Sequence, residues 1–283
     1  MRRTHLAITK MERNPDRITR GCPKTQLKFM KRTAIVLAFT LVCSAAALLL
    51  PAMPQPLDYH LFVDRRTFFG VPNFLDVASN IGFFVAGALG LYVVLRRNTS
   101  FEAGIERLPY AVFFLGLLLT TFGSGYYHLE PGNERLFWDR LPMTIAFMSL
   151  IASQIMDRID RKTGLYLLLP MLLVGAASVV YWRMTERAGA GNVMPYGILQ
   201  GYSVVALLAI AVLHRSRYTH ANIVYGVFAA YVVAKLLEIF DRQIYELGHV
   251  ISGHSLKHLA AGVAGLLVCA MLWRRRCAIE FAV

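Results

Sequence analysis

Residues 254–273 read HSLKHLAAGVAGLLVCAMLW. This apolar run has the length that an α-helix needs to cross the hydrocarbon of a membrane, which is roughly 20 residues. It begins with His254 and His258, which are spaced four residues apart. On a helix that spacing places both imidazoles on one face. The first prediction is therefore a membrane helix that carries a pair of metal-ligating side chains near one end.

Similar apolar runs recur along the whole chain. It has 283 residues, of which 56% are hydrophobic and only 17% are charged, and its mean hydropathy is +0.48. Because lipid cannot satisfy backbone hydrogen bonds, each run is expected to be helical. The predicted fold is an all-α, polytopic transmembrane helix bundle, with a seven-helix core over residues 74–273 and one extra N-terminal helix. The expected spans are 33–50, 74–95, 109–127, 138–156, 165–182, 195–213, 222–240 and 254–273.

The N-terminal region has two interpretations. Residues 1–32 form a basic tail that is expected to be disordered, and residues 33–50 form a first transmembrane helix or a signal-like segment. Lys31 and Arg32 before the apolar run, and the small residues 44–47 after it, resemble a signal peptide. An uncleaved helix is the favoured interpretation. Residues 51–73 are then an outer loop, and residues 274–283 a basic cytoplasmic tail.

The net charge of +13 follows the membrane topology rather than a nucleic-acid surface. With the N-terminus inside, the inside segments carry 21 Lys and Arg residues and the outside segments carry 6. Cytoplasmic loops are enriched in these residues, so both termini are expected in the cytoplasm. A bacterial inner membrane fits this pattern, with a eukaryotic compartment as the alternative. No nucleic-acid partner is expected.

This topology gathers residues that are far apart in the sequence. The third span ends at His128, the fourth begins near Asp139, and the last begins at His254 and His258, so all four are expected near the outer, periplasmic face. Three protein ligands that leave a position for water are the catalytic pattern for zinc, which lowers the pKa of that water toward 7. The alternative for any single histidine is a hydrogen bond to a neighbouring helix. The histidines left without a role are His5, His60, His214, His220 and His249.

Two further residues are candidates for catalysis. Asp139 could act as a general base or orient a ligating histidine, or it could simply cap its helix or pair with Arg140. Ser124 lies one turn before His128 on the same helix face, where its hydroxyl could donate to an oxyanion. Its alternative role is close helix packing.

Charged residues also occur inside the seventh span. Lys235 and Glu238 share a helix face and are expected to form an internal ion pair, although together with Asp241 they could also mark a transport path. Lys257 lies between the two histidines of the last span. Its long side chain is expected to extend outward to the lipid headgroups.

These motifs resemble a known family. Ser124 and His128, then Asp139 in the sequence WDRLPM, and finally the sequence HSLKH at 254–258 resemble the alkaline ceramidases, which belong to the CREST superfamily of membrane hydrolases together with the adiponectin receptors. Ser79-Asn80 in the second span also resembles a motif of that family. The resemblance covers about residues 60–273.

The resemblance implies zinc on His128, His254 and His258, with Asp139 activating water and Ser124 supporting the oxyanion. It implies hydrolysis of a lipid amide to a fatty acid and a sphingoid base. Ser79 and Asn80 would be structural or pocket residues. The family's acidic calcium-binding segment is not matched, because Arg65 and Arg66 interrupt the stretch and its glutamates are missing. That puts calcium, and ceramide as the substrate, in doubt. The candidate calcium ligands are Asp58, Asp64, Asn73 and Asp76.

The leading hypothesis is therefore a zinc-dependent membrane amidohydrolase whose substrate is a lipid that enters from the bilayer. A second hypothesis is a receptor or lipid-binding protein that keeps a structural zinc. A third is a cation or proton transporter that uses Lys235, Glu238 and Asp241. A haem protein is a fourth, weaker hypothesis, because bis-histidine ligation usually draws on facing helices.

Overall fold

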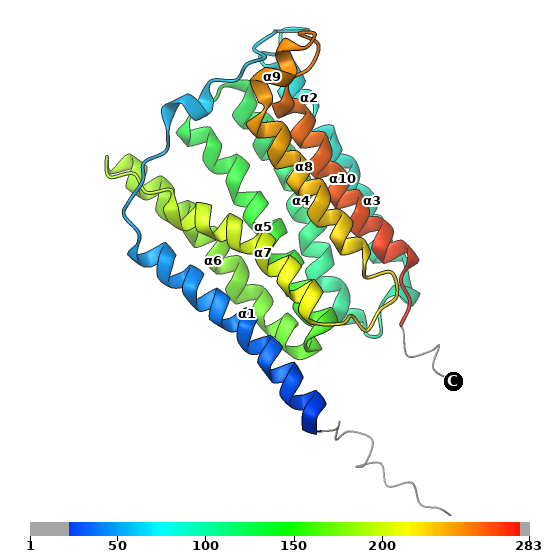
Figure 1. The fold of residues 1–283 in the computed structure, drawn as a ribbon. Helices are drawn as coiled ribbons and strands as arrows, with labels where there is room; N and C mark the ends of the chain where they lie inside the picture. Colours follow the sequence, from blue (N-terminus) through cyan, green and yellow to red (C-terminus); the bar gives the residue numbers. More distant parts are fainter. Residues whose placement is uncertain (1–22, 278–283) are drawn as a thin grey trace, which may run out of the picture.

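The computed structural model describes residues 23–277, which fold as an all-α helical bundle (Figure 1). In the described part of the chain, the β pairing is limited to two isolated bridges, Phe68–Val71 and Tyr218–Cys277. The helices are α1 Pro23–Leu49, η2 Leu57–His60, α2 Phe74–Ala78, α3 Ile81–Arg96, η3 Asn98–Ser100, η4 Gly104–Glu106, α4 Arg107–Leu129, α5 Asn133–Arg158, α6 Arg161–Arg187, α7 Met194–Leu213, α8 Ile223–Ile239, α9 Asp241–Glu246 and α10 Gly253–Arg274.

Six helical segments within residues 23–277 are long and apolar enough to cross a membrane, which fits an integral, multi-pass membrane protein. They contain α1, α2 with α3, η4 with α4, α6, α7 and α10. Each of the remaining two expected spans is also a helix, α5 or α8. Helix α8 has 17 residues, somewhat fewer than the roughly 20 that cross the hydrocarbon.

Helix α5 is long but carries many polar residues, which its neighbouring helices shield from the surroundings of the bundle. It packs against α4, α6 and α7, and its second half buries Ser149, Ser153 and Gln154. The two serine hydroxyls donate to carbonyls of their own helix, and the Gln154 amide donates to the hydroxyl of Tyr110. A helix enclosed by other helices can carry such groups once they are hydrogen-bonded.

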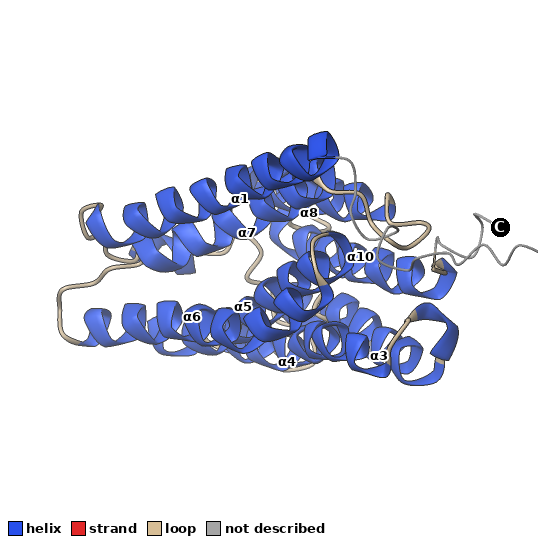
Figure 2. Cartoon of the chain, turned by 90° about the horizontal axis from the view of Figure 1, so that it is seen from below, coloured by secondary structure: helices blue, strands red, loops and turns tan. Residues whose placement is uncertain are grey.

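The bundle has two layers, one of α1, α7 and α8 and the other of α3, α4, α5 and α6 (Figure 2). Helix α10 packs against both α8 and α3 and joins the layers. Helix α1 lies outside the core against α7, where the hydroxyls of Thr40 and Tyr202 are 3.0 Å apart. This arrangement matches a seven-helix core with one extra N-terminal helix.

Two of the sequence predictions for the bounds of elements differ from the structure. Helix α1 begins at Pro23, so residues 23–32 are helical rather than part of a disordered tail, because Gln26–Met30 carry residues that continue the helix. Residues 1–22 and 278–283 lie outside the described residues, so most of the predicted tail at each end is not described. The segment between the expected spans 222–240 and 254–273 contains the short helix α9.

The expected second span is broken rather than continuous. Helix α2 ends at Ala78 and α3 begins at Ile81, with Ser79 and Asn80 between them. The Ser79 hydroxyl and the Asn80 amide both donate to the backbone carbonyl of Asp76, at 3.0 and 2.8 Å. Such local side-chain bonds compete with the helical backbone pattern, which explains the break.

Candidate metal centre

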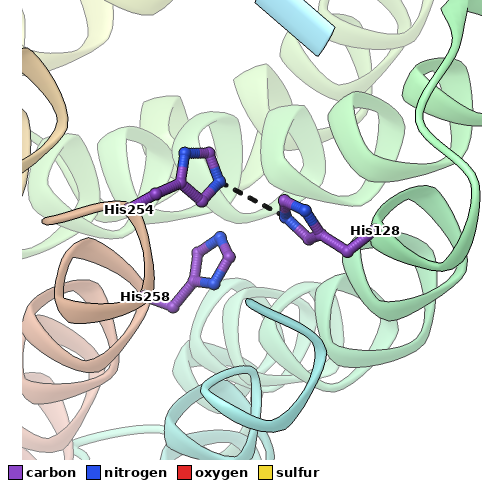
Figure 3. Close-up of side chains that lie close together, drawn as sticks. All are labelled: His128, His254 and His258. Atoms are coloured by element: carbon purple, nitrogen blue, oxygen red, sulfur yellow. Dashed lines mark hydrogen bonds between the residues drawn. The ribbon is translucent and has the colours of Figure 1, made fainter. Parts of the chain in front are cut away.

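Three buried imidazoles converge at one end of the bundle (Figure 3). His128 comes from the last turn of α4, and His254 and His258 come from the first two turns of α10. The ring centroids are 4.9 to 5.0 Å apart, and one nitrogen from each ring lies within 4.8 Å of the other two. The expectation that the three side chains meet is thus confirmed, and the group could bind a metal ion.

The start of α10 is held in place by its own caps. The Ser252 hydroxyl accepts a hydrogen bond from the backbone N–H of Ser255 at 3.0 Å. The backbone N–H of His254 donates to Asp241 Oδ1 at 2.8 Å. A Cβ on Gly253 would lie 2.1 Å from the Leu237 carbonyl oxygen, so only glycine allows α10 to begin this close to α8. These contacts fix the backbone that presents His254.

Ser79 determines which nitrogen of His258 is available. Its hydroxyl donates to the Asp76 carbonyl, so toward His258 Nδ1, at 2.8 Å, it acts as the acceptor. His258 therefore carries its proton on Nδ1 and leaves the Nε2 lone pair free. A hydrogen bond at the second nitrogen is the usual support of a metal-ligating histidine. The break between α2 and α3 is what places Ser79 at this ring.

The backbone of His128 is held by a hydrogen bond from Asn73, and one nitrogen of its ring, Nδ1, has no partner among the described residues. The Asn73 amide donates to the His128 carbonyl at 2.8 Å, at the end of α4. His128 Nδ1 is buried and has no hydrogen-bond partner among the described residues. The Nε2 atoms of His128 and His254 lie 3.4 Å apart. The two Nε2 atoms thus face each other and can share one proton as a hydrogen bond, whereas the buried Nδ1 of His128 is a polar atom left unsatisfied by the described residues.

Asp139 and Ser124 lie together, and Ser124 is one helical turn before His128 on α4. Their carboxylate and hydroxyl interact as hydrogen-bond partners across α5 and α4. A Cβ on Gly123 would lie 2.0 Å from the carbonyl oxygen of Trp138, so the two helices make backbone contact at this level. Arg140 turns away from Asp139, toward the Gln55 amide oxygen at 2.7 Å and the rings of Trp182 and other aromatics. The alternative of an Asp139–Arg140 pair is thus not what the structure contains.

The outer loop, residues 51–73, covers the triad. Phe62 is buried and its ring centroid lies 4.7 Å from that of His128 and 4.6 Å from that of His254. His60, which the sequence left without a role, binds the Tyr127 hydroxyl through Nδ1 at 2.9 Å and the Asn133 side-chain oxygen through Nε2 at 2.8 Å. The loop is therefore fastened to the ends of α4 and α5, directly above the histidines.

An ion pair closes the far end of the loop. Arg66 donates to both oxygens of Asp64, at 2.8 and 2.7 Å, and to the Val250 carbonyl at 2.7 Å. Burial of the Asp64 carboxylate raises its pKa, but the hydrogen bonds and charge of Arg66 outweigh this and hold the pKa below its usual value. The ionised pair joins the outer loop to the segment that leads into α10.

Three of the four candidate calcium ligands, Asp64, Asn73 and Asp76, are engaged with protein groups, and Asp58 is exposed. Asp64 is bound by Arg66, and the Asn73 amide donates to the His128 carbonyl. Asp76 Oδ1 accepts hydrogen bonds from the hydroxyls of Ser255 at 2.6 Å and Ser252 at 3.3 Å. In residues 23–277, the group with metal-binding geometry is the histidine triad. Asp76 thus supports the start of α10 rather than only capping its own helix.

The charges of α8 are paired, and one expectation about them was wrong. Glu238 binds Lys235, as expected, but it also binds Lys257 of α10 at 2.6 Å. Lys257 therefore points toward α8 and not outward to lipid headgroups, because a carboxylate lies within its reach. The Glu238 contact joins α8 to the helix that carries two of the three histidines.

Several of these supporting residues had no signal in the sequence. Phe62 and His60 lie in a loop without a motif, and their contacts join segments that are distant in the chain. Asn73 has a left-handed backbone, with φ of 47°, a conformation that asparagine tolerates. Because this angle cannot be read from the sequence, Asn73 gave no signal there either. Ser79 was singled out only through the family resemblance.

The chain matches no protein-family model, and a search of curated proteins finds no match either.

Proposed function

We propose that this protein is a zinc-dependent membrane hydrolase that cleaves the amide bond of a lipid, in the manner of a ceramidase. The observation that carries the proposal is the convergence of His128, His254 and His258, with Asp139 hydrogen-bonded to Ser124 one helical turn before His128. The resemblance of the same residues to the alkaline ceramidases supports the reaction class.

The residues present fit a metal ion. Each of the three imidazoles offers one nitrogen within 4.8 Å of the other two, and His258 makes a hydrogen bond to Ser79 through Nδ1, which leaves its Nε2 available as a ligand. Imidazole ligands suit zinc, and three protein ligands leave a coordination position open, as in catalytic rather than structural zinc sites. When bound by His128, His254 and His258, zinc would supply Lewis acidity that polarises the substrate carbonyl and makes water a stronger acid.

Asp139 and Ser124 supply the proton transfer and the hydrogen bonding of the proposed reaction. Asp139 would accept the proton of the attacking water as the water oxygen bonds to the carbonyl carbon, and would then return that proton to the leaving nitrogen as the C–N bond breaks. The Ser124 hydroxyl donates to Asp139 in the structure. In the proposed reaction its single proton would turn to the substrate oxygen as charge develops there. Hydrolysis then yields a carboxylic acid and an amine.

An apolar cavity inside the bundle supports a lipid substrate. It has a volume of about 130 Å³ and its exposed lining is almost entirely apolar. Thr120 on its wall lies one turn from Ser124, Ala261 lies three residues after His258, and the Phe83 ring packs 5.9 Å from that of His258. The cavity thus begins directly beneath the triad, where an acyl chain attached to a reacting carbonyl would lie.

The cover of residues 51–73 favours entry of the substrate from the bilayer. Phe62 packs on two of the three histidines, so the end of the bundle is closed above the triad. A lipid would reach the site sideways between helices, with its reacting group at the histidines and its chains in the membrane.

We also propose a bacterial inner membrane as the location, with both termini in the cytoplasm. The support is the excess of Lys and Arg in the segments assigned to the inside, 21 against 6. The histidine triad lies at the opposite end of the bundle from those segments, which corresponds to the periplasmic face.

Asp139→Asn tests the reaction. Purified protein in detergent would be incubated with N-acyl sphingoid bases and other N-acyl lipids, and the fatty acid released would be measured. We expect Asp139→Asn to lower the turnover by about 10²- to 10⁴-fold while the metal content stays unchanged, because only the proton acceptor is lost. The matched control is Asp58→Asn in the exposed part of the outer loop, which should retain full activity.

A non-enzymatic receptor with a structural metal is the second candidate. The burial of the triad under Phe62 favours it, because structural metal sites are closed to water. This candidate predicts that wild-type protein binds N-acyl lipids without releasing fatty acid, and that Asp139→Asn changes neither lipid binding nor metal content. That combination of results would overturn the hydrolase proposal.

A further inference from the structure

A second pocket lies at the opposite end of the bundle from the histidines. It is an open cavity of about 540 Å³ between the end of α5, the start of α6 and the loop that joins α7 to α8. Along α5, Asp139 and Arg158 are separated by roughly 28 Å at the rise of an α-helix, about the thickness of the hydrocarbon core. The pocket therefore lies near the other membrane face and is independent of the metal centre.

Positive charge dominates this pocket. Two acidic residues line it, Asp157 and Asp160, and both are engaged elsewhere. Asp157 accepts from Arg275 at 2.6 Å and from the Tyr110 hydroxyl at 2.7 Å, while Asp160 caps α6 by accepting from the backbone N–H of Thr163 at 2.7 Å. Five basic residues face them across the pocket: Arg158, Arg161, Lys162, Arg215 and Arg217.

The basic residues differ in how far protein groups neutralise them. Arg161 and Arg217 lie within 3.8 Å of the carboxylates of Glu102 and Glu106, which balance their charges. Lys162 and Arg215 are exposed and form no hydrogen bond or salt bridge with any residue in the described part of the chain, although the charge of Lys162 is attracted by the nearby Asp160 carboxylate. The side chains free to bind a ligand are therefore these two.

Arg158 adds a buried charge without a carboxylate. No acidic side chain among residues 23–277 lies within ion-pair distance of it. Its guanidinium donates to neutral oxygens, those of the Gln154 side chain and of the Ala211, His214 and Ala221 carbonyls. A pocket with one such buried cation and two exposed ones is electrostatically suited to a multivalent anion.

We propose that this pocket binds a phosphate group, carried by the headgroup of an anionic phospholipid. Phosphate matches the cavity because it has more acceptor oxygens than a carboxylate, so that more cations can share it. A lipid is the source that fits the location, because the pocket opens between helix ends at the membrane face, where basic pockets meet anionic headgroups. Nothing in this proposal depends on the histidines or on the hydrolase activity.

The test measures lipid retention by the full chain. Protein purified in an uncharged detergent would be mixed with phosphatidylglycerol or with phosphatidylcholine, and native mass spectrometry would count the lipids that remain bound. The variant Lys162→Gln/Arg215→Gln removes the two unpaired charges. We expect wild type to retain phosphatidylglycerol but not phosphatidylcholine, and the double variant to bind it about thirtyfold more weakly.

A matched control removes the same charge outside the pocket. Lys28→Gln/Lys31→Gln changes two exposed lysines of α1, which do not line the cavity, and should leave binding unchanged. If both double variants lost phosphatidylglycerol binding equally, the binding would depend on general surface charge and not on the pocket, which would overturn the proposal. So would displacement of the lipid by inorganic phosphate at equal concentration, because the ligand would then be a soluble phosphate. A midpoint of thermal unfolding equal to that of wild type shows that each variant is folded.

Discussion

The hydroxyl of Ser79 links the histidine triad to the break between α2 and α3. It donates to the Asp76 carbonyl and accepts the Nδ1 proton of His258, so one side chain fixes both the backbone and the tautomer. The ring of His258 would otherwise be free to rotate and to protonate at either nitrogen. Metal affinity should therefore depend on a residue that does not itself contact the metal.

Ser79→Ala tests this dependence. We expect its zinc affinity to fall by at least about tenfold, as is usual when the hydrogen-bond partner of a ligating histidine is removed. The measurement is a competition titration with a fluorescent zinc chelator. Ser149→Ala is the control, because Ser149 is equally buried but donates only to backbone carbonyls of its own helix. Equal affinity in the two variants would show that Ser79 does not support the metal.

Local spacing and membrane topology predicted the central residues of the site. His254 and His258 follow from the i, i+4 rule, and the charge count placed His128 and Asp139 at the same end. The contacts of Phe62 and the direction of Lys257 could not be predicted, because both depend on partners that are distant in the sequence. Periodicity reports the face of a helix but not the neighbour which that face meets.

The contact between α4 and α5 depends on glycine. A Cβ at Gly123 would overlap the Trp138 carbonyl oxygen at 2.0 Å, whereas a Cβ at Gly125, on the next part of the same helix, would meet no atom within 4 Å. The close approach at Gly123 brings Ser124 to Asp139. The separation of these two helices thus sets the geometry of the proposed proton acceptor.

Gly123→Ala should push α4 and α5 apart. Overpacking of this kind costs about 1–3 kcal/mol, so we expect a lower midpoint of thermal unfolding together with reduced hydrolysis. Unfolding can be followed by tryptophan fluorescence in detergent. Gly125→Ala should leave both quantities nearly unchanged, because its methyl group points into open space. If the two variants behave alike, the close contact at Gly123 has no role in the site.

The helices themselves were predictable to different degrees. Apolar runs located a helix at each expected span, and six of these helical segments in residues 23–277 are long and apolar enough to cross a membrane. The break at Ser79 and Asn80 was missed, because two polar residues inside an apolar run give no turn signal. The start of α1 at Pro23 was also missed, because the hydropathy pattern marks the lipid-crossing part of a helix and not the full helix.

The whole bundle separates two chemically different ends. One end holds the histidine triad under the outer loop, with α2 and α9 nearby (Figure 1). The other end holds the basic pocket between α5, α6 and the loop after α7. Between them lies the apolar cavity that begins beneath the triad. This division suits a protein that handles a lipid at one face and is anchored by anionic lipids at the other.

We expect metal binding to stabilise the whole bundle, because α4 and α10 would each supply ligands to the same ion. Removal of the metal with a chelator should lower the midpoint of thermal unfolding, and added zinc should restore it in proportion to the logarithm of its concentration. The His258→Ala protein should show neither response. A chelator effect of equal size in that variant would place the metal elsewhere.

The most direct test of the central claim is the metal content of the purified protein, measured by mass spectrometry on wild type and on His258→Ala side by side. We expect about one zinc per chain in wild type, because three protein ligands and one water form a single four-coordinate site. We expect the variant to lose that zinc. Well-folded wild-type protein without stoichiometric metal, or a variant that keeps its full zinc content, would contradict the central claim.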